Sequence, residues 1–172
     1  PKDYAKALKW YTKAAEQGLA AAQYGLAYMY HNGEGAPKDY AKALRWYTQA
    51  AEQGLAGAQY GLAGMYHKGE GVPKDYAKAL KWYTKAAEQD HSSAEYTLGF
   101  MYRFGQGVPK DYAKAVQWYT EAAVQGHSAA QYNLGYMYNQ GEGVPKDYAE
   151  AIKWYAKAAE QEALKGEMGE MG

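Results

Sequence analysis

The chain repeats one pattern with a strict period of 36 residues. Two residue types mark the period at every copy: Pro1, Pro37, Pro73, Pro109 and Pro145, and Trp10, Trp46, Trp82, Trp118 and Trp154. A fixed period of this size is typical of stacked-repeat arrays, in which each unit buries its apolar face against its neighbours. The 172 residues are therefore expected to form one folding unit whose core is divided among the repeats.

The first half of the period predicts an amphipathic helix. The segment "KDYAKALKWYTKAAEQG" begins with Asp3, which suits a helix N-cap, and ends at Gly18, which suits a left-handed C-cap. At 100° per residue, one broad face collects Tyr4, Ala7, Leu8, Tyr11, Ala14 and Ala15, with Trp10 at its edge. The opposite side carries lysine and glutamate and should face water.

The second half predicts a shorter helix, seen most clearly in "HSAAQYNLGYMYNQG". Its core face holds Ala130, Leu134, Met137 and Tyr138, and Gly141 is a suitable C-cap. One repeat position is always small, as expected where a neighbouring helix approaches closely: Ala27, Ala63, Gly99 and Gly135. The following "GEGVP" predicts a tight turn before the next cap.

Composition removes several classes of protein. Formal net charge is zero, from 19 basic and 19 acidic residues, so the chain as a whole has no bias toward nucleic acid or anionic membrane. There is no cysteine, and hence no disulfide framework or thiolate metal site. No apolar run is long enough to span a membrane, and no charged-then-apolar leader is expected at the start. The sequence does not indicate a compartment.

The pattern "A-x-Y-x-L-G-x-M-Y-x-x-G-x-G-V-P-K-D-Y-x-x-A-x-x-W-Y-x-x-A-A-x-Q-G" resembles the Sel1-like repeat, a relative of the tetratricopeptide repeat, over residues 1 to about 162. The resemblance implies an all-α, right-handed α-solenoid of antiparallel helix pairs, in which the "AQYNLGYMY" helix is the first of each pair. It also implies a concave groove, lined by the first helices, that binds proteins or peptides. Some bacterial members carry a cysteine pair in each repeat, which this chain lacks.

The family phasing gives the domain organisation. It predicts a single array over residues 1–162, with an unpaired second helix at 1–18 and helix pairs at 19–54, 55–90, 91–126 and 127–162. A degenerate tail follows at 163–172. The glycines and glutamates of this tail count against a stable helix.

Candidate binding residues lie on the face of each first helix that is opposite its core. This face is aromatic, whereas an ordinary solvated face would be polar. The tetratricopeptide groove positions, transferred by matching the Leu-Gly pair, select the same residues. The predicted partner-binding groove contains Tyr24, Tyr28, His31, Asn32, Tyr60, His67, Lys68, Tyr96, Phe100, Arg103, Phe104, Tyr132, Tyr136, Asn139 and Gln140.

Two interpretations of this aromatic face remain open. Packing between adjacent repeats is favoured for the invariant column of Tyr24, Tyr60, Tyr96 and Tyr132, since aromatic area is usually core area. Binding is the other interpretation, and it applies to positions that vary between repeats. One such column holds Tyr28, Gly64, Phe100 and Tyr136, as expected where a scaffold alters its contacts from repeat to repeat.

Catalytic and metal-binding groups do not converge in the sequence. His31 with Glu34 and His67 with Glu70 have similar spacings, but each glutamate lies in the glycine turn beyond the helix. Zinc sites need three or four ligands. His91 stands at a helix start, as does His127, and both are expected to shape the turn. The "GEG" turns lack the context of a phosphate loop.

A third interpretation rests on the polar side of the second helices. A basic outer ridge there would contain Lys6, Lys9, Lys13, Lys42, Arg45, Lys78, Lys81, Lys85 and Lys114. Glutamates interrupt it at Glu16, Glu52, Glu88 and Glu121, so weak nucleic-acid binding ranks third.

The sequence therefore predicts a noncatalytic scaffold, without a cofactor, that binds a protein or peptide segment in its groove. The alternative is an architectural or consensus-designed array with no dedicated ligand. Neither end has an ordinary capping repeat, so weak end-to-end self-association, or coverage of an end by the tail, is also predicted.

Overall fold

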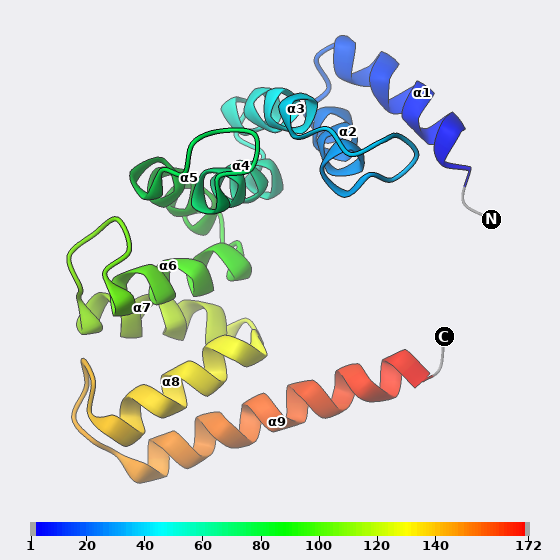
Figure 1. The fold of residues 1–172 in the computed structure, drawn as a ribbon. Coiled ribbons are helices and arrows are strands. Elements are labelled where there is room, and N and C mark those ends of the chain that lie inside the picture. The colour runs from blue at the N-terminus through cyan, green and yellow to red at the C-terminus, as the bar shows by residue number, and fades with distance from the viewer. Residues whose placement is uncertain (1–2, 171–172) are drawn as a thin grey trace. The chain divides into compact units, whose positions relative to one another are not determined.

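The structure is a computed structural model that describes residues 3–170. Pro1, the residue after it, and the last two positions of the predicted tail lie outside the described residues. Within residues 3–170 all regular structure is helical: α1 (Tyr4–Glu16), α2 (Ala20–Asn32), α3 (Tyr40–Glu52), α4 (Ala56–Lys68), α5 (Tyr76–Ala87), α6 (Ser92–Phe104), α7 (Tyr112–Val124), α8 (Ser128–Gln140) and α9 (Tyr148–Glu170) (Figure 1). The helices alternate between the two sequence types, so α2, α4, α6 and α8 are first helices and the others are second helices.

Each helix packs mainly on its neighbours in sequence, which makes the fold an all-α repeat solenoid, as predicted. The chain forms two compact units, unit 1 up to Gln89 and unit 2 from Asp90 onward. In unit 1, α1 packs on α2, α2 on α3, α3 on α4 and α4 on α5; in unit 2, α6 packs on α7, α7 on α8 and α8 on α9. The single folding unit expected from the period stays a prediction.

Helix ends follow the capping residues that the sequence marks. The carboxylates of Asp39 and Asp111 accept hydrogen bonds from the amides of Lys42 and Lys114, three residues on, both at 3.0 Å. First helices end at a left-handed glycine, such as Gly141 with a φ of 73°. These caps recur at the same place in each repeat, so the sequence period becomes a structural period.

His91 and His127 act as N-caps of the first helices in unit 2. Their Nδ1 atoms accept from the amides of Ala94 and Ala130, both at 3.3 Å. Burial lowers the pKa of His91, and burial together with the charge of Lys165 lowers the pKa of His127. Both imidazoles are therefore kept in the neutral form, which can accept a hydrogen bond.

The core of each repeat is built from the predicted faces. Leu134 and Met137 of α8 are buried, as are Tyr47 of α3 and Tyr119 of α7. The repeat position that is always small lies where a neighbouring helix approaches closely, as expected. At Gly99, an added Cβ would lie 2.6 Å from a ring carbon of Tyr119. Helices can approach closely only where that side chain is small.

The helix α1, which is of the second-helix type, keeps part of its apolar face exposed. Trp10 is 65% exposed, whereas the equivalent Trp46 in α3 is 7% exposed. Tyr4 and Tyr11 are exposed as well. Part of the apolar face of α1 is therefore uncovered among the residues that the structure describes.

The expectation that the tail forms no stable helix is wrong for residues 163–170, because α9 continues through them to Glu170. Earlier second helices are followed by a residue in the left-handed region, where Gly18, Gly54 and Gly126 have φ values of 90°, 92° and 88°. The fifth copy has Glu162 at this position, so the helix does not stop there. Figure 1 shows the last turns of α9 continuing past the start of α8.

Candidate functional site

The predicted binding residues all lie at least partly on the surface. We use the term first-helix face for the fifteen residues predicted above to line the groove. Six of them are exposed: Tyr28, Asn32, Lys68, Phe104, Tyr132 and Gln140. The others are half-buried: Tyr24, His31, Tyr60, His67, Tyr96, Phe100, Arg103, Tyr136 and Asn139. None lies in the core, so the face is available for contact but much of it is also packed.

In unit 1 the first-helix face takes part in an open cavity of about 640 Å³ between α1 and α2. Tyr24 and Tyr28 of α2 form one side, and Tyr11 of α1 forms another. The carboxylate residues Asp3 and Glu34 also line it. The cavity therefore combines aromatic walls with acidic groups, which suits an apolar or cationic side chain.

In unit 2 four residues of the first-helix face form a continuous cluster, which we call the aromatic–arginine cluster: Phe100, Arg103, Phe104 and Tyr136. The rings of Phe100 and Phe104 have centroids 4.5 Å apart. The guanidinium carbon of Arg103 lies 4.5 Å from the ring centroid of Tyr136 and 5.2 Å from that of Phe104. Residues from α6 and α8 thus meet through one cation–π stack.

Arg103 is held in this position by two further side chains. Its Nε donates to Glu142 Oε2 at 3.2 Å, and its Nη1 donates to Asn133 Oδ1 at 3.1 Å. Only 12% of the Arg103 side chain is exposed. Glu142 and Asn133 were not among the predicted residues. Glu142 lies in the glycine turn of the following repeat, and its contact with Arg103 depends on how adjacent repeats pack, which helical periodicity does not show.

The two predicted histidines of unit 1 pack on tyrosines of their own helix pair. His31 lies against Tyr40 and Tyr47, with ring centroids 5.5 and 5.9 Å apart. His67 lies against Tyr76 and Tyr83 in the same way, at 5.2 and 5.9 Å. The carboxylate bonded to His31 is that of Glu70, in the turn of the following repeat. Among residues 3–170 no group of three or more histidine, aspartate and glutamate side chains is placed to hold a metal ion.

Part of the invariant tyrosine column packs between neighbouring repeats. Tyr24 is in ring contact with Tyr47, at 6.0 Å, and lies beside Gly57 of the next first helix. Tyr96 stacks on His127, with ring centroids 4.8 Å apart and an angle of 18° between the planes. Tyr132 differs in its exposure: its ring contacts that of Tyr155 in α9, with centroids 5.2 Å apart, and 58% of the residue is exposed.

Burial also controls ionisation in this region. It raises the pKa of Tyr47, Tyr83 and Tyr119 above the usual tyrosine range. These hydroxyls therefore stay protonated at physiological pH, and none of the three is a candidate general base.

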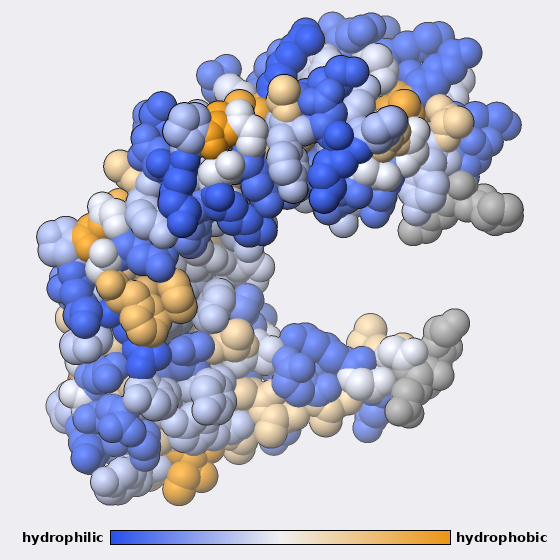
Figure 2. Space-filling view, viewed as in Figure 1, coloured by the Kyte–Doolittle hydropathy of each residue, from blue (hydrophilic) through white to orange (hydrophobic). Residues whose placement is uncertain are grey.

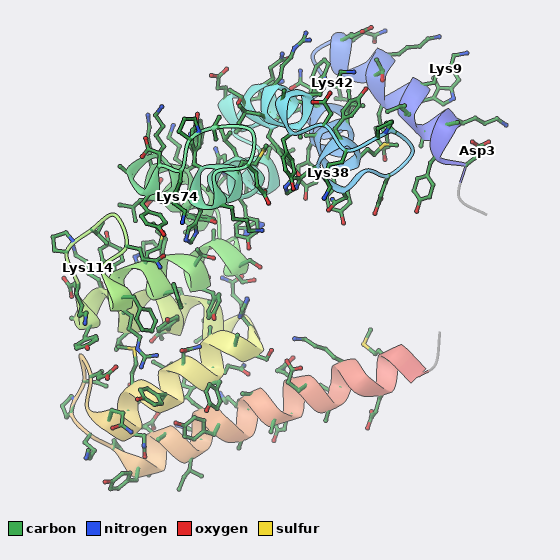
Figure 3. All side chains as sticks on the ribbon, viewed as in Figure 1. Asp3, Lys9, Lys38, Lys42, Lys74 and Lys114 are labelled. Carbon is green, nitrogen blue, oxygen red and sulfur yellow. The ribbon has the colours of Figure 1, made fainter. Side chains whose placement is uncertain are left out.

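The basic residues of the second helices are exposed, but many lie over aromatic rings of the same unit. Lys42, Lys78 and Lys114 stand 5.1–5.3 Å from the ring centroids of Tyr30, Tyr66 and Tyr102. Figure 3 shows the side chain of Lys9 pointing outward from α1. The described part of the chain has no helix with both the length and the apolar character of a membrane span.

Comparisons with solved structures identify proteins of the same architecture. The chain is 42% identical to a protective antigen of uropathogenic Escherichia coli that displays an SLR fold, with a TM-score of 0.91 over 94% of this chain and 34% of that one. It is 39% identical to a Sel1 repeat protein from Oxalobacter formigenes, with a TM-score of 0.88 over 94% of this chain and 66% of that one. The chain therefore spans about a third of the first relative and just under two thirds of the second.

A more distant structural relative is the Helicobacter pylori cysteine-rich protein B. It is 29% identical, with a TM-score of 0.57 over 72% of this chain and 89% of that one. No curated protein shows significant similarity to the chain. The family model of the Sel1 repeat matches residues 1–19, 20–55, 56–91, 92–127 and 128–162. With these matches across nearly its whole length, the chain belongs to the Sel1 repeat family.

Proposed function

We propose that this chain is a noncatalytic interaction scaffold that binds a segment of another protein on its first-helix face. Sel1 repeats commonly mediate interactions between proteins, and that role supports the proposal. We assign two separate binding sites: the aromatic–arginine cluster in unit 2, and Tyr24 and Tyr28 at the cavity in unit 1.

The observation that carries the proposal is the aromatic–arginine cluster itself. Phe104 is 51% exposed although it is a large apolar residue, and its ring contacts both Phe100 and the guanidinium of Arg103. Aromatic and arginine side chains dominate the energetics of protein interfaces, above all where they are fixed before binding. Glu142 and Asn133 fix Arg103 here. Binding at this cluster would therefore cost little side-chain entropy.

The chemistry of the cluster indicates the kind of segment it would bind. The charge of Arg103 is already balanced by Glu142, 3.2 Å away, and little of its side chain is exposed. The free surface is therefore mainly the ring of Phe104 and the edges of Phe100 and Tyr136. We assign to unit 2 a segment with an aliphatic or aromatic anchor residue, and to the acidic tyrosine cavity of unit 1 an anchor with a cationic head group.

The architectural alternative is favoured by the packing of the invariant column. Tyr24 and Tyr96 contact the next repeat. His31 and Arg103 are already bonded to Glu70 and Glu142 of the following turns. On this alternative the first-helix face is interrepeat packing with no ligand of its own. The architectural alternative gives no role to the exposed ring of Phe104.

A peptide selection distinguishes the two functions. A random peptide library displayed on phage is selected against the immobilised chain, and selected peptides are measured on three proteins: the unaltered chain, Phe104→Ala, and Ile152→Ala as a matched control. Ile152 is also a large exposed apolar residue of unit 2, but it lies on α9. We expect Phe104→Ala to weaken binding by about 1–3 kcal/mol and Ile152→Ala to leave it unchanged.

Two further variants separate the surface from the core. Phe100→Ala and Tyr136→Ala should weaken the same peptides while helicity stays close to that of the unaltered chain. Leu134→Ala is the control for core damage, since Leu134 is buried, and it should lower thermal stability by about 2–5 kcal/mol. Selected peptides that bind all the surface variants equally would leave the architectural function as the better account.

A further inference from the structure

Each second helix carries one tryptophan, and in most of them a cation of the same helix lies over its ring. Figure 2 shows mainly hydrophilic residues on the visible side of α3 and α5. The pairs, with distances to the ring centroid, are Lys13 over Trp10 at 5.2 Å, Arg45 over Trp46 at 4.9 Å, Lys85 over Trp82 at 4.9 Å and Lys157 over Trp154 at 4.6 Å. Among residues 3–170, Trp118 of α7 is the member of this column with no cation over its ring.

Two sequence changes remove the cation from Trp118. The position directly before the tryptophan is Gln117 in α7 but is basic in the other repeats, at Lys9, Arg45, Lys81 and Lys153. Three residues after the tryptophan, α7 has Glu121 where other repeats have Lys13, Lys85 and Lys157. One position has therefore lost its positive charge, and the other carries a negative charge instead.

An open pocket of about 340 Å³ lies beside this ring, and we call it the Trp118 pocket. Its lining consists of Gln117, Trp118 and Glu121 of α7, with Lys114 near the start of the same helix and Tyr102 of α6. Trp118 is half-buried, whereas Glu121 is exposed and has no hydrogen bond or ion pair with a residue that the structure describes. Residues three apart on a helix are neighbours, so the pocket presents an indole ring beside a free carboxylate.

The positive charge of Lys114 does not prevent the pocket from accepting a second cation. Lys114 is held over a tyrosine ring of α6, 5.3 Å from its centroid. In α5 of unit 1, Lys78 holds the equivalent place while Lys85 covers the tryptophan of the same helix. Two cations are thus accommodated side by side in that repeat. In α7 the carboxylate of Glu121 replaces the second of them, which makes the Trp118 pocket more favourable for a cation from outside.

We propose that the Trp118 pocket binds an arginine side chain of another protein, which covers Trp118 as Arg45 covers Trp46. A planar guanidinium stacks on an indole ring and at the same time donates two N–H groups to a carboxylate, here that of Glu121. The compact ammonium group of lysine fits this pair of contacts less well. The pocket shares no residue with the first-helix face, so the proposal does not depend on binding there.

Two observations favour another protein as the source of the arginine. First, α7 packs on both α6 and α8, and each repeat of a solenoid contacts only its neighbours, so an additional repeat would not reach this pocket. Second, a second copy of this chain offers no free arginine. Its arginines are Arg45, which already lies over Trp46, and Arg103, which is bonded to Glu142 and is only 12% exposed in its side chain.

An NMR titration of the full ¹⁵N-labelled chain tests the proposal, because each tryptophan gives its own indole N–H signal. The signal of Trp118 is the one that Trp118→Phe removes. The probe is the tripeptide Gly-Arg-Gly with blocked ends. We expect a saturable shift of the Trp118 signal and little change at the tryptophans that already have a cation of their own helix. The same tripeptide with citrulline, the neutral analogue of arginine, is the ligand control and should leave the Trp118 signal in place.

Two variants of the chain change the pocket at exposed positions, so that the fold is kept. Glu121→Gln should weaken binding of the arginine tripeptide about 10-fold, because it removes a charged hydrogen-bond acceptor. Glu160→Gln is the matched control, since Glu160 is an exposed glutamate of the same unit outside the pocket. Gln117→Arg gives α7 the residue that Arg45 provides in α3. It should cover Trp118 from within the helix and abolish the shift.

A peptide selection extends the test to longer segments. Random peptides displayed on phage are first depleted on the Gln117→Arg protein, which removes those that bind the first-helix face, and are then selected on the unaltered chain. The selected peptides should carry an arginine that the binding requires.

Several results would overturn the proposal. These are equal shifts with the arginine and citrulline tripeptides, unchanged binding to Gln117→Arg, and selected peptides without enrichment in arginine. A Trp118 signal that moves with protein concentration in the absence of peptide would also overturn it, because the occupant would then be a second copy of the chain.

Discussion

His31 Nε2 lies 2.7 Å from Glu70 Oε2, so a first helix is joined to the glycine turn of the following repeat, 39 residues further on. Arg103 and Glu142 make the same connection in unit 2, also 39 residues apart and at 3.2 Å. The four side chains are mostly shielded from water. Each pair therefore fixes the register between two repeats in a way that general apolar packing does not.

The first prediction concerns Glu70. Glu70→Ala should lower the free energy of unfolding by about 1 kcal/mol, because the half-buried ring of His31 loses its partner. Urea unfolding followed by circular dichroism measures the change. Glu34→Ala is the control, since Glu34 holds the same turn position one repeat earlier and no side-chain hydrogen bond to it is present among residues 3–170. Equal losses for the two variants would show that the contact with His31 adds no stability.

The second prediction concerns the buried carboxyl group of Glu95. Its column otherwise holds Gln23, Gln59 and Gln131, and burial raises the pKa of Glu95 while the hydrogen bond from Gln125 partly opposes the shift. An acid whose pKa is raised by folding stabilises the fold below its unfolded pKa and loses that contribution as pH rises through the folded pKa. Stability should therefore fall as pH rises above about 4.5, the unperturbed value.

Glu95→Gln removes this titration and restores the residue of the other repeats. We expect a higher Tm than that of the unaltered chain at pH 7, and a difference that shrinks toward pH 4. Thermal melts across this range check both statements. Glu160→Gln, at an exposed position of the same unit, should leave the pH profile unchanged. A melting temperature for Glu95→Gln that stays below the unaltered value at neutral pH contradicts the argument.

The third prediction concerns the left-handed position after each second helix. Gly54 has a φ of 92°, and nothing lies within 4 Å of a Cβ placed on it. Gly54→Ala should therefore cost about 1–2 kcal/mol through backbone strain alone. Asp90 holds the equivalent position with a φ of 59°. Asp90→Gly should therefore raise the free energy of unfolding, by less than Gly54→Ala lowers it. Chemical denaturation measures both, and a neutral Gly54→Ala would show that this backbone position relaxes freely.

The fourth prediction concerns the end of α9. Glu162→Gly restores the residue found at Gly18, Gly54 and Gly126, and also removes the bonds of Glu162 to Ser128 and Lys165. Glycine inside a helix costs about 1 kcal/mol relative to a good helix former. Hydrogen exchange should therefore show loss of amide protection over residues 163–170, with α8 unaffected. Unchanged protection there would mean that Glu162 is not what lets the helix continue.

The fifth prediction concerns the basic residues of the second helices. We expect no appreciable binding to DNA or RNA near physiological salt, since the net charge is zero and glutamates interrupt the lysines. Lys81 and Lys85 lie over the ring of Trp82, 6.0 and 4.9 Å from its centroid. Filter binding over a salt series tests this. Tight, salt-sensitive binding that is lost when Lys78, Lys81 and Lys85 are neutralised would reverse the conclusion.

Local features of the fold were predictable because each depends on residues close together in sequence. The carboxylate of Asp111 and the glycine at 141 mark helix ends directly, and the spacing of Leu134 and Met137 marks a core face. The continuation of α9 does not follow from the composition of the tail, because the glycines at 166 and 169 weaken a helix. It follows from a single position, where Glu162 replaces the left-handed glycine that ends an earlier second helix.

The candidate site was less predictable because it depends on contacts between repeats. Helical periodicity places Arg103 and Phe104 on one face, but it does not show that Glu142 neutralises the arginine. That contact requires the offset between one first helix and the next turn, which is set by packing. The exposure of Tyr132, in a column whose other members pack, likewise depends on which helix packs against α8.

The bonds between a first helix and the following turn also change what counts as an exchangeable module. Arg103 and Glu142 belong to different helix pairs, so a helix pair moved alone to a new position would carry the arginine and leave its carboxylate behind. The unit that keeps its chemistry intact runs from a first helix through the next glycine turn, and overlaps its neighbour. Duplication or shuffling of these repeats is therefore subject to epistasis between adjacent copies, with substitutions at the face and at the downstream turn inherited as pairs.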